Sequence, residues 1–186
     1  RGQQDSYTFN ATAGQAVNVS AAKDSGDYYF CPLAELYDPT GTLISTSACN
    51  GSTGSVGLTL SGAYTVVVRD NSFGDTGTYS VSVQSTTGQC GTSLCGETKT
   101  GEIKTRGQQD PYTFSATAGQ AVIVSAAKDS GDYYFCPLAE VYDPAGKLIA
   151  TSQCNGKTET VKISQTGTHT ILVRDKVFGN IGTYGM

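Results

Sequence analysis

The chain has 186 residues, 15% of them charged, with a net charge of −4 and a sequence pI near 4.8. A nucleic-acid-binding face is rich in Lys and Arg, so this acidic composition argues against nucleic acid as a partner. No apolar run approaches the roughly 20 residues of a membrane helix, and we expect no membrane span. The low charge and the 23 glycines are typical of a turn-rich surface protein.

Two-residue alternation of apolar side chains begins in the segment 7–11 and recurs along the chain at 17–21, 56–60, 64–68 and 79–83. This period indicates strands with one buried face, and turn residues separate the strands. The pattern predicts an all-β fold built as a jelly-roll or immunoglobulin-like antiparallel β-sandwich. The side chains expected to face inward are Tyr7, Phe9, Val17, Val19, Leu36, Val66 and Val68, with their counterparts in the repeat described next.

The chain contains one long internal repeat. Residues 1–79 align with residues 106–184 without a gap, and about 70% of the positions are identical. The block AAKDSGDYYFCPLAE occurs in both copies, at Ala21–Glu35 and at Ala126–Glu140. The repeat predicts two tandem domains of the same fold, residues 1–89 and 96–186, joined by a linker at residues 90–95.

A predicted hairpin brings two of the six cysteines together. A turn centred on Thr40 pairs residues whose numbers sum to 80, which places Cys31 opposite Cys49 and within reach of a disulfide. The same reasoning pairs Cys136 with Cys154 in the second repeat. Cys90 and Cys95 would close a small loop in the linker. An even, duplicated set of cysteines indicates disulfides and an extracellular or cell-surface location, whereas Cys-x4-Cys without a nearby His is a poor zinc site.

Three short motifs resemble a known family. The runs YTFNATAGQAVNVS, AELYDPTGTLI and GAYTVVVRD with GTYSVSV are similar to the bacterial pre-peptidase C-terminal (PPC) domain, and the second repeat matches in the same places. The resemblance implies a jelly-roll-like β-sandwich found in secreted bacterial proteins, often attached to hydrolases. The cysteine pair and the DSGDYYFCP block depart from the general pattern of that family.

No catalytic motif is present: the chain lacks Gly-x-Ser-x-Gly, His-Glu-x-x-His and a phosphate-binding glycine loop. Its single histidine, His169, replaces Tyr64 of the first repeat at an alternating strand position. We therefore expect His169 to fill a partly buried position, and we expect the protein not to be an enzyme and to need no cofactor.

Acidic residues in the loops could bind calcium, and this is the alternative to a protein without metal. Carboxylates are the hard oxygen ligands that calcium selects, but Asp in Gly-containing loops also serves turns without any metal. The candidate ligands are Asp24, Asp27, Asp129 and Asp132.

Aromatic residues and glycosylation motifs complete the candidate sites. Consecutive aromatics are expected on both faces of one strand. One face packs in the core, and the other either binds a ligand such as carbohydrate, joins an interface, or packs locally. These candidates are Tyr28, Tyr29, Tyr133 and Tyr134, together with the loop residues Phe73 and Phe178.

The pattern Asn-x-Ser/Thr occurs at Asn10, Asn18 and Asn50, and all three are lost in the second repeat.

The two repeats differ at their ends. The first closes with a complete Gly77-Thr-Tyr-Ser-Val-Ser-Val strand, whereas the second reaches only Gly182-Thr-Tyr-Gly-Met, so we expect its last strand to be missing. We expect the segment 96–105 to be a leading strand for the second repeat, and we expect no equivalent strand for the first. An open sheet edge near Gly182–Met186 would be a template for another chain.

These observations favour a non-enzymatic extracellular structural protein. In this hypothesis the chain is the repeat subunit of a filament or surface fibre, a head-to-tail homopolymer completed by strands from neighbouring subunits. The alternative is a tandem carbohydrate- or protein-binding module from a secreted hydrolase.

Overall fold

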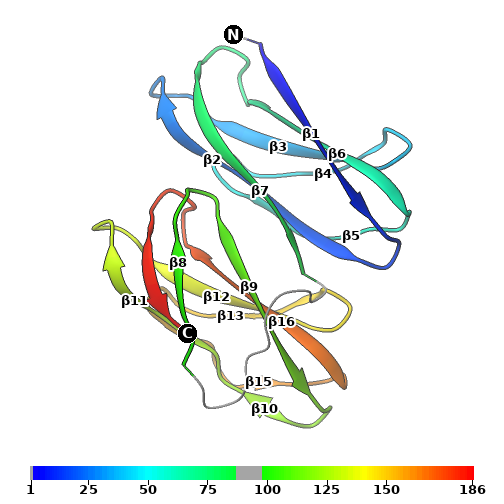
Figure 1. The fold of residues 1–186 in the computed structure, drawn as a ribbon, viewed down its shortest axis with the longest axis vertical. Helices are drawn as coiled ribbons and strands as arrows, with labels where there is room; N and C mark the ends of the chain where they lie inside the picture. Colours follow the sequence, from blue (N-terminus) through cyan, green and yellow to red (C-terminus); the bar gives the residue numbers. More distant parts are fainter. Residues whose placement is uncertain (1, 87–97) are drawn as a thin grey trace.

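The computed structural model describes residues 2–86 and 98–186, and Figure 1 traces the two repeats as two β-sandwiches, one above the other. The predicted all-β architecture is confirmed. The first sandwich consists of β1 (Gln4–Ala11), β2 (Ala16–Gly26), β3 (Pro32–Tyr37), β4 (Leu43–Thr46), β5 (Ser52–Gly57), β6 (Gly62–Asp70) and β7 (Gly77–Ser85). The second consists of β8 (Thr100–Ile103), β9 (Gln109–Ala116), β10 (Ala121–Val122), β11 (Ser125–Gly131), β12 (Pro137–Tyr142), β13 (Leu148–Thr151), β14 (Gly156–Lys157), β15 (Val161–Lys162), β16 (Gly167–Asp175) and β17 (Gly182–Gly185). Within these ranges no helix has the length and hydropathy that crossing a bilayer requires.

Each sandwich consists of two antiparallel sheets that enclose a core. In the first repeat the β3 sheet has the order β1-β6-β3-β4, and the β2 sheet has the order β5-β2-β7. In the second repeat the β12 sheet, β9-β16-β12-β13, reproduces the β3 sheet. The opposite layer contains the β11 sheet, β14-β11-β17-β8, and the short pair β10-β15. The second repeat also includes β8, which precedes Arg106, where its alignment with the first repeat begins.

The alternating residues form the core of the first repeat, as predicted, with one exception. Val17 and Val19 of β2 pack against Leu36, Val66 and Val68 of the β3 sheet, and all five are buried. Tyr7 was expected to face inward with them, but its side chain is 44% exposed. Because β1 is an edge strand, Tyr7 reaches the rim of the sandwich, where its hydroxyl lies 2.9 Å from that of Tyr79.

The closing strand of the second repeat is shorter than its counterpart but is not missing. β7 pairs along β2 from Gly77 to Ser85, whereas β17 pairs with β11 over Gly182–Gly185 alone. The other edge of β17 is paired with β8, and Met186 continues this ladder through backbone hydrogen bonds with Lys99. The open edge that we expected at Gly182–Met186 is therefore occupied on both sides within this chain.

Both predicted hairpin disulfides are present. Cys31 is bonded to Cys49 and Cys136 to Cys154, each pair with Cα atoms 5.3 Å apart. The predicted register holds at Tyr37 and Leu43, but a bulge beyond this pair shifts the rest of the ladder by one residue. A bulge adds one residue on one strand, so the sum rule that we derived from the turn fails after it. The predicted pair Cys90–Cys95 lies outside the described residues.

His169 is fully enclosed, not partly buried as we expected. Its ring stacks on Phe114 with centroids 5.2 Å apart, and its Nδ1 lies 3.2 Å from the carbonyl oxygen of Gly167. The other ring nitrogen, Nε2, has no hydrogen-bond partner among the described residues. In the first repeat the larger Tyr64 donates its hydroxyl to the carbonyl oxygen of Leu60 at 2.8 Å. The histidine is therefore a core residue with one ring nitrogen unpaired within the described part of the chain.

This contrast generates a pair of stability predictions. His169→Tyr is expected to raise the free energy of unfolding by about 1 kcal/mol, because a hydroxyl that can reach the loop replaces an unpaired buried nitrogen. Tyr64→His is expected to lower it by about 1–3 kcal/mol for the converse reason. Each kcal/mol corresponds to about 4–8 °C in Tm for a domain of this size, which scanning calorimetry resolves. A lower Tm for His169→Tyr would contradict this explanation.

Candidate functional site

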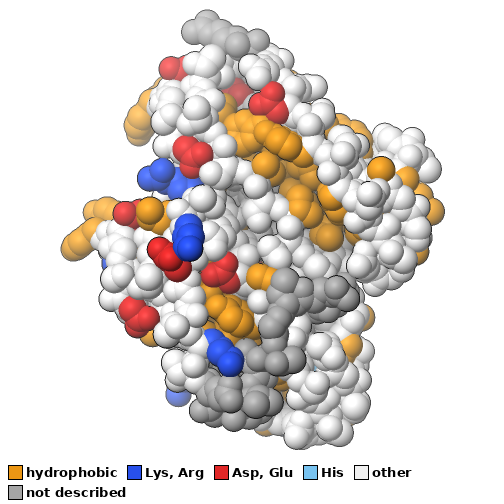
Figure 2. Space-filling model, in the orientation of Figure 1, with side chains coloured by type: hydrophobic (Ala, Val, Ile, Leu, Met, Phe, Trp, Pro, Cys, Tyr) orange, Lys and Arg blue, Asp and Glu red, His pale blue; other side chains and the backbone are white. Residues whose placement is uncertain are grey.

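An apolar seam runs along the first sandwich where the edges of its two sheets come together. Figure 2 shows a strip of apolar side chains on this face, over the space between β1 and β7. Core residues that remain only partly buried line it, namely Phe9, Tyr79, Val81 and Val83, with the exposed Tyr7. An apolar strip beside an unpaired strand edge is a surface on which a further strand gains both hydrophobic burial and backbone hydrogen bonds.

In the second repeat β8 covers the equivalent seam. Thr100–Ile103 pairs antiparallel with Gly182–Gly185, so that Ile103 lies opposite Gly182 and Gly101 lies opposite Tyr184. Ile103 is buried in the core of the second repeat, and Tyr184 is fully enclosed, unlike its counterpart Tyr79. Within the predicted leading segment 96–105, Thr100–Ile103 forms the strand, and residues 96 and 97 lie outside the described residues.

Gly101 is the position that brings β8 close to the sandwich. A Cβ atom on this residue would lie 2.3 Å from the hydroxyl oxygen of Tyr184 and 2.6 Å from that of Tyr112. These distances are shorter than real Cβ contacts, so a side chain here would push the strand away from the two tyrosines. The completing strand therefore needs glycine opposite Tyr184 and has an aliphatic residue two positions later.

The side chain of Gln108 forms two hydrogen bonds with the backbone at the end of β8. The Gln108 amide nitrogen donates to the carbonyl oxygen of Glu102 at 2.9 Å, and its amide oxygen accepts from the backbone N–H of Lys104 at 2.7 Å. The same nitrogen also donates to Asp110 at 2.7 Å, which fixes the orientation of the amide. One side chain thus satisfies a backbone acceptor and a backbone donor of the added strand.

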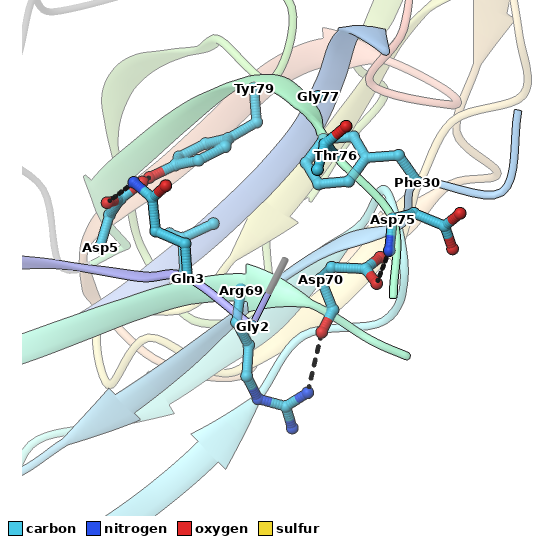
Figure 3. Close-up of a pocket in the computed structure, with 11 residues that line it drawn as sticks. Gly2, Gln3, Asp5, Phe30, Arg69, Asp70, Asp75, Thr76, Gly77 and Tyr79 are labelled. Carbon is cyan, nitrogen blue, oxygen red and sulfur yellow. Dashed lines mark hydrogen bonds between the residues drawn. The ribbon is translucent and has the colours of Figure 1, made fainter. Parts of the chain in front are cut away.

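The first repeat contains the matching groove, shown in Figure 3. It has a volume of about 100 Å³ and is lined by Gly2, Gln3, Asp5, Phe30, Val68, Arg69, Asp70, Asp75, Thr76, Gly77 and Tyr79. Gln3, the counterpart of Gln108, already donates to Asp5 at 2.8 Å, as Gln108 does to Asp110. The Gln3 side chain is therefore held by its Asp neighbour in the first repeat as Gln108 is in the second.

The tyrosine at this seam is held neutral beside a charged carboxylate. The Tyr79 hydroxyl donates to Asp5 at 2.7 Å, and this hydrogen bond lowers the pKa of Asp5. Burial, together with hydrogen bonds to Tyr7 and Asp5, raises the pKa of Tyr79. Tyr79 therefore keeps its proton across the ordinary pH range and stays in place as one wall of the groove.

Asp70 anchors the base of the groove. Its Oδ1 accepts from the backbone N–H of Cys31 at 2.9 Å, and its Oδ2 accepts from the Ser72 hydroxyl at 2.6 Å and from the backbone of Gly74 and Asp75. Desolvation acts to raise the pKa of Asp70, but these hydrogen bonds outweigh it and lower the pKa from 3.8 to about 2. The carboxylate ties the disulfide hairpin to the loop that leads into β7.

Three of the four carboxylates proposed for calcium accept hydrogen bonds from neighbouring loops and strands. Asp24 accepts from the Ser80 hydroxyl at 3.0 Å, Asp27 from the backbone N–H of Thr76 at 2.8 Å, and Asp132 from that of Ile181 at 3.1 Å. Asp129 makes no such bond with residues 2–86 or 98–186. Across residues 2–86 and 98–186, no group of three His, Cys, Asp or Glu side chains is placed to hold a metal ion.

The paired tyrosines lie in turns, not on a strand as we expected. Tyr28 and Tyr29 follow β2 in a turn that is closed by the Phe30 amide, which donates to the carbonyl oxygen of Asp27. Only Phe30 points inward, against Gly77. Tyr28 is 88% exposed, and its ring meets that of Tyr29 edge to face with centroids 5.0 Å apart. Tyr133 and Tyr134 repeat this arrangement.

Phe73 and Phe178 occupy equivalent loops in different surroundings. Each has a positive φ, and an arginine lies over each ring, Arg69 over Phe73 at 4.5 Å and Arg174 over Phe178 at 4.4 Å. Phe73 is 44% exposed, whereas Phe178 is 5% exposed. The first ring is thus free at the surface and the second is enclosed.

The three glycosylation motifs also differ in exposure. Asn10 is exposed on β1, so its use as an acceptor stays a prediction. Asn50 has a positive φ, and its side-chain oxygen accepts from the backbone N–H of Lys23. Asn18 is buried and donates to Gln109 of the second repeat at 3.1 Å, so a glycan has no room there in the folded chain.

The roles of Gln3, Gln108 and Gly101 were not predicted from the sequence. The Gln-Gln pair that begins each repeat carried a signal, because both glutamines are kept at 3–4 and 108–109. The alternation was read for apolar residues only, and so Gln3 and Gln108 were passed over.

Comparisons with known proteins assign no family. No family model matches the chain, and no curated protein matches it. Among solved structures, it is similar to the CUB1-EGF-CUB2 domain of human MASP-1/3, at 9% identity, over 99% of this chain and 92% of that one, with a TM-score of 0.25. A likeness this low supports no argument about function.

The Asp70 network generates a pH prediction. The folded-state pKa lies below the unfolded value, so the stabilisation is present above about pH 4 and is lost as the pH falls toward 2. The loss is expected to be about 2 kcal/mol of unfolding free energy. Asp70→Asn is expected to be less stable at pH 7 and to show a flatter dependence between pH 4 and 2, measured by urea unfolding. An unchanged slope in the variant would show that other groups control acid unfolding.

Proposed function

We propose that the protein is a non-enzymatic, extracellular structural subunit that assembles into a filament or surface fibre through strands added across subunit boundaries. In this proposal it acts on no substrate, needs no cofactor, and has other copies of itself as its partner. The disulfide-bonded hairpins support a location outside the cytoplasm, where such bonds persist.

One observation carries the proposal: β8 covers the seam of the second repeat, whereas the described residues leave the equivalent seam of the first repeat open. β8 precedes Arg106, where the second repeat begins, and it covers the seam between β9 and β17. The first repeat has the same groove, with Gln3, Gly77 and Tyr79 in the places of Gln108, Gly182 and Tyr184. A strand delivered to this groove by a neighbour would complete the first repeat as β8 completes the second.

The groove determines which residues an added strand must carry. By analogy with β8, glycine must face Tyr79 and a branched aliphatic residue must face Gly77. Gln3 then supplies one donor and one acceptor to the backbone of the strand. Repetition of such a contact from unit to unit adds subunits head to tail, and a head-to-tail contact that does not close extends into a filament.

The alternative function is a tandem accessory module that binds carbohydrate or protein. The exposed pairs Tyr28–Tyr29 and Tyr133–Tyr134 favour it, because each presents two aromatic rings in the same geometry on both repeats. The resemblance to PPC domains points the same way, toward a module attached to a secreted hydrolase. The strand-binding groove has no role in this alternative.

A peptide tests the groove directly. The eight-residue peptide TKTGEIKT, the sequence of residues 98–105, is expected to bind the full chain at the first repeat. Replacing its glycine by valine should weaken binding at least tenfold, because the added side chain meets Tyr79. Gln3→Ala in the chain should also weaken binding, by about fivefold, since two hydrogen bonds worth about 0.5–1.5 kcal/mol each are lost and partly replaced by water. Gln4→Ala is the matched control, and titration calorimetry is the measurement.

Electron microscopy and sedimentation of the 186-residue chain test the assembly itself. We expect fibres at high protein concentration, and we expect an excess of the glycine-containing peptide to shorten them, because the peptide occupies the groove. A chain that stays monomeric at every concentration and does not bind the peptide would overturn the proposed function.

A further inference from the structure

The two repeats contact each other through different faces. Ser20 of β2 donates to the carbonyl oxygen of Gly107 at 2.7 Å, and Gln109 donates to the Ser20 hydroxyl at 3.3 Å. Asn18 donates to the side-chain oxygen of Gln109 at 3.1 Å. Farther along, Ser55 donates to the carbonyl oxygen of Gly146 at 2.5 Å. The outer face of the β2 sheet in the first repeat therefore lies against the outer face of the β12 sheet in the second.

The face that the first repeat contributes is open in the second repeat. The alternating residues Ala16, Asn18, Ser20 and Ala22, named here the β2 face, are all buried. Their counterparts Ala121, Ile123, Ser125 and Ala127, named the β11 face, are all exposed. Asn18 is 1% exposed and Ile123 is 56% exposed. The difference in exposure shows how completely the second repeat covers the β2 face.

The face that the second repeat contributes is in turn open in the first repeat. Gly107, Gln109, Tyr142 and Gly146, named the β12 face, are buried. Their counterparts Gly2, Gln4, Tyr37 and Gly41, named the β3 face, are identical in residue type and less covered: Gly2, Gln4 and Gly41 are exposed, and Tyr37 is half-buried. One chain thus carries an uncovered counterpart of each of the two surfaces that fit together at its centre, and the counterpart of β2 is interrupted between β10 (Ala121–Val122) and β11 (Ser125–Gly131).

We propose that the β11 face of one copy of this chain packs against the β3 face of the next copy, and that this contact repeats the one between the two repeats. Ser125 then takes the place of Ser20 against Gly2 and Gln4, and the hydroxyl of Thr160 takes the place of Ser55 against Gly41. This contact goes beyond the added strand of the proposed function and rests on a separate observation, the burial of equivalent residues.

The geometry of the step makes the assembly open-ended. The contact joins two unlike faces, so it is heterologous and leaves one free face of each kind after every addition. Figure 1 shows the two sandwiches one above the other in similar orientations, so the step from one repeat to the next is largely a translation. Repetition of a step of this kind gives a column rather than a small ring.

One central residue differs between the inner contact and the proposed outer contact. Asn18 has a side-chain oxygen that is buried without a partner among the described residues. Ile123 stands at this position in the β11 face and has no polar atom to satisfy. Covering Ile123 removes an exposed apolar side chain from water, while Ser125 and Thr160 keep the two hydroxyl groups that the inner contact uses. The outer contact therefore exchanges one amide hydrogen bond for apolar burial.

Engineered disulfides test the contact, and the inner interface supplies the control. A Cβ atom built on Gly107 lies 3.4 Å from the Cβ of Ala22, which is near the separation in a disulfide. The control variant Ala22→Cys/Gly107→Cys is therefore expected to form a bond within one chain. The equivalent pair across the outer contact is Gly2→Cys/Ala127→Cys. On mild oxidation it should form a bond between chains and give a ladder of multiples of the chain mass on a non-reducing gel.

Two further variants show whether the ladder depends on the face. Ser125→Arg added to Gly2→Cys/Ala127→Cys should slow cross-linking at least tenfold, because the counterpart Ser20 is fully enclosed and leaves no room for arginine. Thr117→Arg is the matched control and should leave the rate unchanged, since its counterpart Thr12 stays exposed beside the covered face. The single variants Gly2→Cys and Ala127→Cys should give no ladder beyond a dimer.

The outcomes separate this contact from the strand contact. A ladder from the double variant that Ser125→Arg suppresses supports the stacked faces, whether or not the groove binds TKTGEIKT. Fibres and peptide binding without a ladder would overturn the stacked faces and leave the proposed function in place. A ladder that is equally fast with Ser125→Arg would also overturn them, because it would arise from random collision.

Discussion

The seam where two sheet edges come together is the constraint on which this structure depends. Burying Val17 and Val19 against Val66 and Val68 fills the space between the sheets, but it cannot cover the side of the sandwich, where edge strands and core side chains face water. The second repeat resolves this with β8, whose Gly101 allows the strand to approach Tyr184 and whose Ile103 enters the core. Backbone hydrogen bonds and apolar burial act together there, so one short strand satisfies both needs.

The outer faces of the sheets connect the fold to assembly. A sheet has two faces, and a sandwich buries only one face of each sheet. The outer side of the β2 sheet carries small residues, such as Ser20 and Ala22, that allow another sheet to approach closely and offer few hydrogen bonds to water. Placed against Gly107 and Gln109, this surface becomes an interface between the repeats. The proposed contacts between chains use surfaces of these two kinds, an open seam and an open face.

Because the repeats are nearly identical, equivalent residues can be compared in two different environments. Phe73 and Phe178 have the same local conformation and the same arginine over the ring, yet one is exposed and the other enclosed. Such pairs separate what a residue does within its own sandwich from what its neighbours do to it. His169 is the converse case: it occupies the same position as Tyr64, but its Nε2 has no partner in residues 2–86 and 98–186.

The sequence by itself determined the repeat, the all-β fold, most of the inward-facing residues and the two hairpin disulfides, because alternation and turn residues are local and recur in both copies. It did not determine the register beyond the bulge near Tyr37, the turn position of Tyr28 and Tyr29, the exposure of Tyr7, or the pairing of β17 on both edges. Each of these depends on contacts between segments far apart in the chain. Only the tertiary structure could decide which identical residues are covered, since Gln4 and Gln109 stand in the same run Arg-Gly-Gln-Gln-Asp, and a second sheet lies against Gln109 alone.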